Sequence, residues 1–326
     1  MLQYGYRPNF PPTRRTKPRS ATWFDYSAIG DRPPIRWPNN ARVALWICPN
    51  LLHFEYNPPE DPWVNSWSRM VPDVFSFGRQ EFGPRAGFWR MLKVLDKHSV
   101  RCTAVTNPAA LKLYPDVRAA AVERNFDYIG HGKFNTRFFF GLSPKEELAY
   151  HRDIVREVED MTGVRMRGMA GPGPQCATED TPDLIAKAGL LYYGDFFHDD
   201  QPFPIKVKSG HLISVPYTLE VNDPGYLGSA FEADQFADTA KRQFDTLYRE
   251  GAENGRVMCI SLHGYLFGQA QRTRYLDQLL EYILSFPDVW QTTGGEIAEY
   301  YMANYYDTMV THLSGKKVGK SKAGRK

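Results

Sequence analysis

The feature that most constrains the fold is a regular alternation of short apolar runs with longer amphipathic stretches. Between residues 41 and 306 the two patterns alternate about seven times. The runs ARVALWIC and RVMCISLH suit buried strands, whereas residues 85–98 place their apolar side chains at the i, i+3, i+4, i+7 spacing of one helix face. Such alternation predicts parallel strands joined by right-handed helical crossovers, and its even spacing favours an α/β barrel over an open sheet.

The two ends of the chain differ from this central region. Residues 1–40 contain seven prolines and no hydrophobic period, so we expect an extended N-terminal arm lying over the barrel. Residues 316–326 hold six Lys and Arg and no acid, which is typical of a disordered tail. The predicted organisation is an arm at 1–40, a catalytic barrel at 41–306 and a basic disordered tail at 307–326. Within the barrel, residues 51–80 form a long irregular insertion of the kind that is usually functional.

Charge and composition exclude several classes of protein. The formal net charge of +3 comes from the two ends, because the chain without residues 1–20 and 316–326 holds 29 Lys and Arg against 37 Asp and Glu. A domain that binds nucleic acid carries its positive charge on the folded body, so we expect no nucleic-acid partner. No apolar run approaches the roughly 18 residues of a membrane span, and the N-terminus lacks the apolar core of a secretory signal.

Two further patterns bear on compartment and cofactors. The four cysteines are far apart and form no CxxC pair, which suggests neither a zinc knuckle nor a disulfide framework; they are Cys48, Cys102, Cys176 and Cys259. Reduced thiols fit a cytoplasmic protein. The chain also has no GxGxxG after its first strand and no GxxxxGK[ST], so we expect no nucleotide cofactor.

Polar residues that follow the predicted strands are the candidates for chemistry, because a barrel places its active site at the carboxyl ends of its strands. They supply carboxylates, imidazoles, amides and an arginine around one barrel mouth. The candidate residues are Asn50, Glu81, Arg85, His131, Asn135, Asp200, Asn222, Asp223 and His263. Structural interpretations stay open beside this one, since a histidine can merely end a strand and an Asp pair can form a solvated turn. Glu81 and Arg85 also have the i,i+4 spacing of an ordinary helical ion pair.

Several segments resemble one family in the right order. They include EFGPRAGFWRMLKVLDKH at 81–98, IGHGKFN at 129–135, LLYYGDFFHDDQPFPI at 190–205, SVPYTLEVNDPGY at 214–226 and ISLHGYLFGQAQRTRYLDQLLEYI at 260–283. Over roughly residues 25–300 the chain resembles the polysaccharide-deacetylase (NodB-homology) superfamily, closest to its cofactor-independent allantoinase and cyclic-imide hydrolase branch. The resemblance implies an α/β fold, a distorted (β/α)7 barrel of NodB-homology type behind the Pro-rich arm, and a homo-oligomer.

The positions that hold metal in the metal-dependent members of that family are altered here. Those members use an Asp and two His spaced H-x3-H, and the matching residues are Asn50, His131 and Asn135. Cys48 stands where the family places a further Asp as base. Neutral amides are poor zinc ligands, so we expect no metal and no other cofactor. A site rebuilt from His53, Glu55 or Asp200 is left open.

The predicted function is a metal-independent amidohydrolase that opens the C–N bond of a small cyclic amide, an imide or an allantoin-like ureide. Glu81 or His131 would be the general base and His263, as the resemblance implies, the general acid. Arg85 with Asn50 or Asn135 would hold the substrate carbonyls and the oxyanion. The remaining carboxylates and amide, Asp200, Asn222 and Asp223, would orient imidazoles or bind ring N–H groups. The alternatives are a metal-dependent carbohydrate N-deacetylase and an inactive barrel that binds carbohydrate or a protein partner.

Overall fold

A computed structural model describes residues 23–58, 71–139, 141–173, 177–227 and 232–323. Part of the predicted insertion and Cys176 lie outside the described residues. Within the insertion, residues 74–82 form a helix rather than an irregular loop. Asp73 caps this helix by accepting a 2.9 Å hydrogen bond from the Ser76 amide, which is the usual way to satisfy a free N–H at a helix start.

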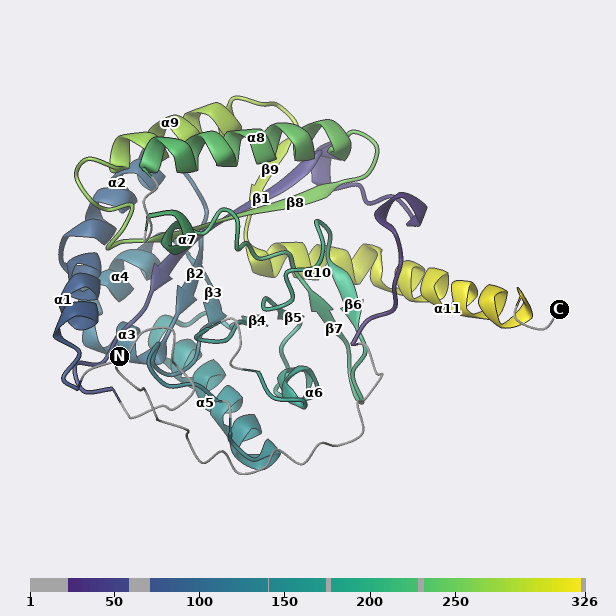
Figure 1. Cartoon of the computed structure of the whole chain (residues 1–326), viewed down its shortest axis with the longest axis horizontal. Helices are drawn as coiled ribbons and strands as arrows, with labels where there is room; N and C mark the ends of the chain where they lie inside the picture. Colours follow the sequence, from purple (N-terminus) through teal and green to yellow (C-terminus); the bar gives the residue numbers. More distant parts are fainter. Residues whose placement is uncertain (1–22, 59–70, 140, 174–176, 228–231, 324–326) are drawn as a thin grey trace, which may run out of the picture.

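One curled sheet organises the chain (Figure 1). Its strands are β1 (Val43–Leu51), β2 (Thr103–Thr106), β3 (Asp127–Gly130), β4 (Gly168–Met169), β5 (Tyr192–Tyr193), β6 (Phe203–Ile205), β7 (Leu212–Ser214), β8 (Arg256–His263) and β9 (Val289–Thr292). The order is β6-β7-β5-β4-β3-β2-β1-β8, with β9 paired to the first half of β1. All neighbours are parallel except β6 and β7, and the predicted α/β class and parallel crossovers are confirmed.

The sheet curls into a half-barrel, and the segments before β6 and after β7 meet the edge strand β8 along a seam. Two backbone contacts cross this seam: the Ser261 amide donates to the Val221 carbonyl at 3.0 Å and the Val257 amide donates to the Asp200 carbonyl at 2.9 Å. Asn222 and Ser261 also form an isolated parallel bridge. The barrel is therefore distorted, as the family resemblance implies, and the segment after β7 takes the place of a long closing strand.

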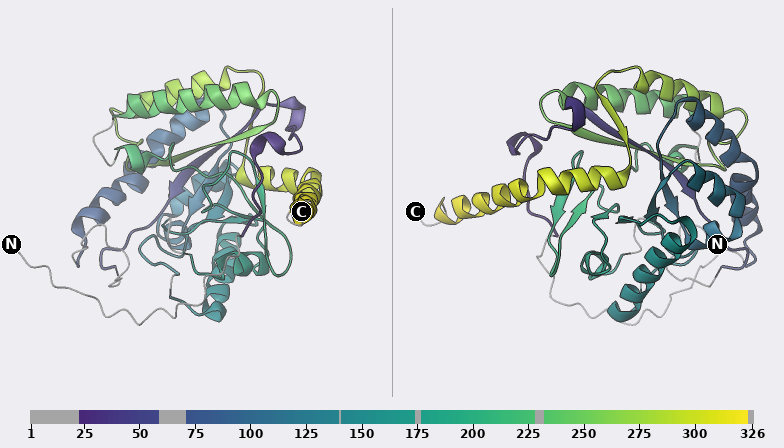
Figure 2. Two further views of the ribbon diagram at one scale, coloured as in Figure 1. Left: turned by 45° about the vertical axis from the view of Figure 1, so that its right-hand side comes forward. Right: turned by 180° about the vertical axis from the view of Figure 1, so that it is seen from behind.

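Helices cover the outside of the curl (Figures 1 and 2). They are α1 (Val74–Phe82), α2 (Phe88–Lys97), α3 (Pro108–Leu113), α4 (Pro115–Glu123), α5 (Pro144–Thr162), α6 (Thr181–Lys187), α7 (Asp223–Leu227), α8 (Ala233–Gly251), α9 (Thr273–Leu284), α10 (Gly294–Asn304) and α11 (Tyr306–Ala323). A π-helical turn at Gly83–Gly87 joins α1 to α2, so the predicted helix at 85–98 starts later than its periodicity indicated. A Cβ at Gly87 would lie 1.8 Å from the Gly264 carbonyl oxygen, so this turn packs directly on the loop after β8.

Side chains of β1 alternate between two buried clusters. Leu45 and Ile47 point outward into the layer between sheet and helices, whereas Trp46 and Cys48 point into the barrel. Inside, Trp46 packs edge-to-face on Tyr192 at 6.3 Å between ring centroids. The interior is thus filled by side chains, which leaves the rim at the carboxyl ends of the strands as the place for a site.

The two ends of the described chain pack on the seam side. In the arm, Arg32 forms an ion pair with Asp199 at 2.7 Å, and both side chains are less than a tenth exposed. At the other end, where a disordered tail is predicted for 307–326, α11 runs from Tyr306 to Ala323. Its first turns bury Met309 and Leu313 against Phe203, an i,i+4 apolar pair that the basic composition of the tail concealed. The remainder of α11 projects from the body (Figure 2).

Two further expectations concern membrane-spanning helices and the cysteines. Among the described helices, none is long and apolar enough to cross a lipid bilayer. The three described cysteines, Cys48, Cys102 and Cys259, are free and buried.

Candidate active site

The carboxyl ends of six neighbouring strands form a polar rim. Following the sheet order, it carries Asp195 after β5, Gly171 after β4, His131 after β3, Asn107 after β2, Asn50 in β1 and His263 at the end of β8. The sequence prediction missed Asn107, which is fully buried and links its own loop to the loops after β1 and β3 by hydrogen bonds. Its carbonyl oxygen accepts from the His53 amide at 3.0 Å, and its amide group donates to the carbonyls of His131 and Gly132. Asn107 directly follows the apolar run TAVT, which is the signal that could have found it.

His263 and Asp223 form a buried pair at this rim. The Nδ1 of His263 lies 2.7 Å from one carboxylate oxygen of Asp223, and the His263 amide donates to the other at 2.8 Å. Asp223 is completely buried, and this burial raises its pKa while His263 opposes the rise. A carboxylate at Nδ1 fixes the ring orientation and the tautomer, so Nε2 is the free acceptor of the neutral imidazole.

His131 is held neutral at the same rim. Burial and, to a smaller extent, the nearby charge of His263 together lower the pKa of His131 to about 3. Its Nδ1 is buried and has no hydrogen-bond partner among the described residues. A histidine that resists protonation is a weak general base but a good neutral hydrogen-bond donor, which favours carbonyl polarisation over the base role predicted from sequence.

Three asparagines present oxygen atoms to the rim. The side-chain nitrogen of Asn50 is already hydrogen-bonded inside the barrel, because it donates to Ser261 Oγ at 2.9 Å and to the carbonyls of Cys48 and Leu262 at 3.2 Å. Its carbonyl oxygen is therefore the group left for a ligand, so Asn50 suits a substrate N–H better than the carbonyl assigned to it above. The side-chain oxygens of Asn135 and Asn222 are buried and lack a donor within the described part of the chain.

Asp195 is a second carboxylate that the sequence prediction missed. It lies just beyond β5 and accepts hydrogen bonds from the Gly171 amide at 2.9 Å and the Tyr193 hydroxyl at 2.8 Å. Burial raises the pKa of Asp195 to about 6, and these two hydrogen bonds oppose the rise. A carboxyl group that titrates close to neutral pH at a barrel rim is a functional candidate. Its place at the end of the buried run LLYYG was readable from the sequence.

Glu81 and Arg85 are close together, but their neighbours differ from those predicted. Arg85 Nε donates to Glu81 at 2.9 Å, while most of the Arg85 side chain is exposed to solvent. Glu81 also accepts a hydrogen bond from the Tyr114 hydroxyl, which in turn lies 2.8 Å from His53 Nδ1. Burial raises the pKa of Tyr114 and lowers that of His53. Glu81 thus belongs to a hydrogen-bonded chain on the outer side of the rim.

A narrow cleft lies between this chain and the end of β8. Asn50, Tyr114 and His263 line it, and its volume of about 30 Å³ holds one or two water molecules. Asp200 lines a different cavity, in the seam, and does not line this cleft. The structure therefore brings Asn50, His131, Asn135, Asn222, Asp223 and His263 to the rim and places Asp200 elsewhere.

The residues at the family's metal position do not fit a divalent transition metal. Asn50, His131 and Asn135 supply two neutral amide oxygens and one imidazole, and the amide nitrogen of Asn50 is already bound to the barrel. Zinc sites use thiolate, imidazole and carboxylate ligands, and this set lacks an anion. Across the described residues, no group of three or more His, Cys, Asp or Glu side chains is arranged to hold a metal ion. Nor do His53, Glu55 and Asp200 form a rebuilt metal site among the described residues, because Glu55 is ion-paired with Arg137 at 2.6 Å.

A curled, largely parallel sheet with helices outside it matches the fold of NodB-type deacetylase and allantoinase structures. No family model matches the chain. In sequence, it is 29% identical over 303 residues to a candidate polysaccharide deacetylase of the fission yeast Schizosaccharomyces pombe, covering 82% of this chain and 93% of that protein.

Solved structures give the same result. The structure matches PuuE allantoinase with a TM-score of 0.73 and 26% identity, over 84% of this chain and 94% of the other. Candidate polysaccharide deacetylases from Pseudomonas aeruginosa PAO1 and Mycobacterium smegmatis share the fold, with TM-scores of 0.71 and 0.72, identities of 24% and 20%, and cover of 84% of this chain and 95% and 94% of theirs. The resemblance to the NodB-homology superfamily near its allantoinase branch is confirmed.

Proposed function

We propose that this chain is a hydrolase acting on C–N bonds, and specifically that it opens a cyclic ureide without a metal ion. The observation that carries the proposal is the buried Asp223–His263 pair beside the side-chain oxygens of Asn135 and Asn222, which have no donor among the described residues. Unpaired buried acceptors are costly unless a ligand supplies donors. A ureide ring carries several N–H groups, whereas a simple imide carries one. Similarity to an allantoinase supports the same class.

In the proposed mechanism one imidazole moves the proton in both directions. Nε2 of His263 takes a proton from water in the adjacent cleft, and the oxygen of that water attacks the ring carbonyl. Asp223, buried against Nδ1, stabilises the imidazolium that forms. The C–N bond then breaks, and Nε2 returns the proton to the leaving nitrogen. This assigns His263 the base role as well as the acid role predicted from sequence.

The other rim residues bind and polarise the ring. Neutral His131 donates a hydrogen bond to the carbonyl oxygen, where negative charge develops. Asn135 and Asn222 accept from ring N–H groups through their unpaired oxygens, and ionised Asp195 accepts another from the opposite part of the rim. A strained ring carbonyl is more electrophilic than an acetamide. Losing the Lewis acid therefore slows ring opening less than it would slow deacetylation, and these hydrogen bonds take over its part.

The experiment measures ring opening of hydantoin, dihydrouracil, allantoin and succinimide, and deacetylation of N-acetylglucosamine oligomers, with and without chelator. We expect ureide opening that survives chelation and falls at least about 100-fold in His263→Gln. His211→Gln, a histidine exposed at the surface, serves as the matched control and keeps the wild-type rate. Sugar deacetylation that depends on added zinc, or absence of ring opening across the panel, would overturn the proposal.

A further inference from the structure

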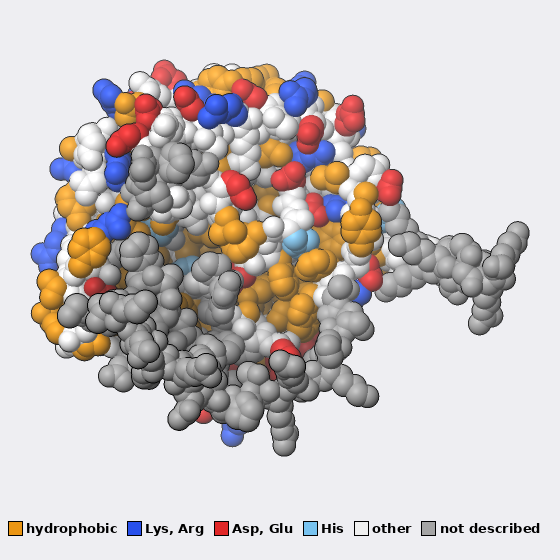
Figure 3. All heavy atoms as spheres, viewed as in Figure 1, with side chains coloured by type: hydrophobic (Ala, Val, Ile, Leu, Met, Phe, Trp, Pro, Cys, Tyr) orange, Lys and Arg blue, Asp and Glu red, His pale blue; other side chains and the backbone are white. Residues whose placement is uncertain are grey.

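A second cavity lies in the seam and shares no lining residue with the cleft beside His263. We call it the seam cavity; its walls include Phe197, His198, Asp200, Glu220 and Gln243, and its volume is about 350 Å³. That volume is in the range of small-molecule sites. Figure 3 shows a hollowed region below α8 and α9 in which acidic and histidine side chains stand among hydrophobic ones.

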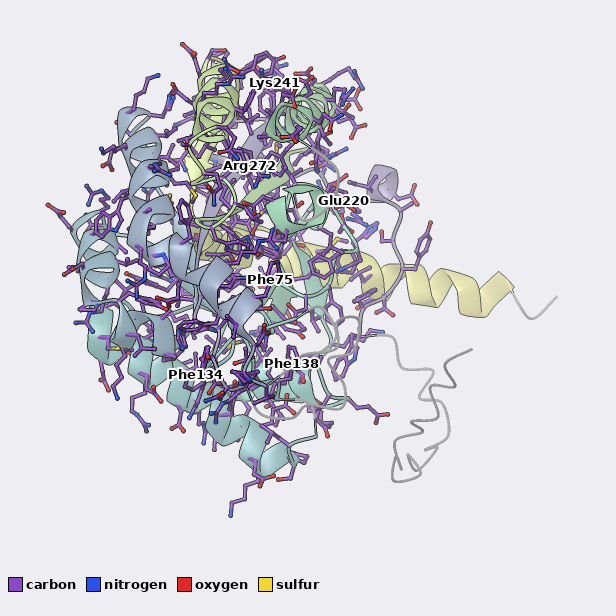
Figure 4. The ribbon with its side chains drawn as sticks, turned by 60° about the vertical axis from the view of Figure 1, so that its left-hand side comes forward. Phe75, Phe134, Phe138, Glu220, Lys241 and Arg272 are labelled. Atoms are coloured by element: carbon purple, nitrogen blue, oxygen red, sulfur yellow. The ribbon has the colours of Figure 1, made fainter. Side chains whose placement is uncertain are left out.

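The seam cavity is also distant from the aromatic residues near the rim. In Figure 4, Glu220 lies on the segment before α7, well apart from Phe134 and Phe138 in the segment after β3. The lining residues of the seam cavity are all different from those of the cleft beside His263, and the mechanism proposed above uses none of them.

Its buried polar atoms are hydrogen-bond acceptors without donors. Nδ1 of His198 lies 3.2 Å from the Phe196 carbonyl, so Nδ1 carries the hydrogen and Nε2 is an acceptor. Burial lowers the pKa of His198, which keeps the ring neutral. Nε2 of His198 and Oε1 of Gln243 are both buried and have no partner in the described part of the chain. A ligand that satisfies them must bring N–H or O–H groups.

The charge around the seam cavity is net negative. Burial and the nearby carboxylates of Asp199, Glu250 and Glu220 raise the pKa of Asp200, whereas Arg256 lowers it. The two basic side chains nearest these groups already form ion pairs, one of them with Asp199, which also lines the cavity. Arg32 is bound to Asp199 at 2.7 Å; Arg256 is bound to Glu250 at 3.3 Å and to the Asn254 carbonyl.

The helix above the cavity does not supply a cation either. Lys241 belongs to α8, as does Gln243, but its ammonium lies 5.4 Å from the centroid of the Tyr282 ring. Figure 4 shows Lys241 at the top of the molecule and Glu220 below it. Among the described residues, Asp200 and Glu220 therefore face the seam cavity without a paired cation.

We propose that the seam cavity binds a small organic cation of the alkylguanidinium class. A guanidinium has five N–H donors for the acceptors of His198, Gln243, Asp200 and Glu220 and keeps its charge at any physiological pH. The apolar wall that Phe197 and Pro216 provide suits the alkyl stem. This site is separate from the proposed ring-opening activity and stands whether or not that activity is found.

The test is calorimetric titration of the full-length protein with butylguanidinium and with its neutral isostere butylurea. We expect saturable binding of butylguanidinium, and at least tenfold weaker binding of butylurea. The double variant D200N/E220Q should bind the cation at least tenfold more weakly. The matched double variant D116N/E281Q removes two carboxylates from α4 and α9 and should bind within twofold of wild type.

Further variants distinguish loss of binding from misfolding, and binding in the seam cavity from binding at the rim. Gln243→Leu keeps both carboxylates and should still weaken binding several-fold, while urea unfolding reports whether each variant is folded. Asp195→Asn at the rim should leave the affinity within twofold. Three outcomes would overturn the proposal: no saturable binding in the millimolar range, equal affinity for butylurea, or binding lost in Asp195→Asn and retained in D200N/E220Q. Competition by calcium ions at equal concentration would also overturn it, because the site would then be one for a hard metal cation.

Discussion

Asp195 gives the sharpest prediction, because its ionised form is disfavoured by the fold that positions it. Burial raises its pKa to about 6, compared with 3.8 for the free side chain. The folded chain therefore holds this proton more tightly than the unfolded chain does. As pH rises from about 4 to 6, the unfolded state loses the proton first, and stability falls. Above pH 6 the cost is complete and constant.

The magnitude follows from the size of the shift. Two pKa units correspond to about 3 kcal/mol at about 1.4 kcal/mol each. Asp195 is partly exposed, and asparagine would satisfy the Gly171 amide and the Tyr193 hydroxyl less well, so we expect Asp195→Asn to gain about 1 to 2 kcal/mol at pH 7.5. The gain should vanish by pH 4. Ring opening should nevertheless fall at least about tenfold, which is the trade between stability and function seen at many active sites.

The assay is urea unfolding of wild type and variant at several pH values between 4 and 8, with the m-value checked for constancy. Asp153→Asn is the control of opposite sign. The pKa of Asp153 is lowered by its hydrogen bond to Lys133, so this variant should lose stability at neutral pH and not gain it. If Asp195→Asn shows no stability gain at pH 7.5, or a gain that does not depend on pH, the account of Asp195 as a partly buried carboxylate whose ionised form the fold disfavours is wrong.

Three further changes test the site and the fold. Asp223→Asn should cut ring opening at least about 100-fold with an unchanged circular dichroism spectrum, because the His263 tautomer loses its carboxylate. Arg32→Met should cost about 3 kcal/mol in urea unfolding, since it leaves Asp199 buried without its cation. Gly168→Ala should cost more than about 2 kcal/mol by the same assay, because the new Cβ would lie 2.1 Å from the buried Tyr192 ring. Gly78→Ala, whose Cβ meets no atom within 4 Å, is its control and should not destabilise.

Much of the rim was within reach of sequence reasoning. A histidine that ends a fully buried, mostly apolar strand, as His263 does, and one between two glycines, as His131 is, both lie at the carboxyl edge where a barrel keeps its chemistry. Asn107 and Asp195 obey the same rule and were missed, because single polar residues after short apolar runs are easily passed over. The i,i+4 pair of Glu81 and Arg85 was also found, since helix periodicity fixes such neighbours.

Other features depend on contacts between distant parts of the chain. Asp200 follows a strand, as the rim residues do, yet it lines the seam because the segment after β7 replaces a closing strand. The first turns of α11 pack on the body because Met309 and Leu313 contact Phe203, although the same segment ends in basic residues. Helix propensity and composition cannot register such a partner.

The sequence by itself determined the alternation of strands and helices, the resulting α/β class and which residue types stand at strand ends, because periodicity and strand direction are local properties of the chain. Only the tertiary structure decided which atoms remain free. Asn50 keeps its oxygen because its nitrogen is bound by the barrel, His131 stays neutral because it is buried near His263, and Asp195 titrates near 6 because the rim encloses it. Hydrogen-bond partners and burial are set by residues far away in sequence, and they determine what each side chain can do.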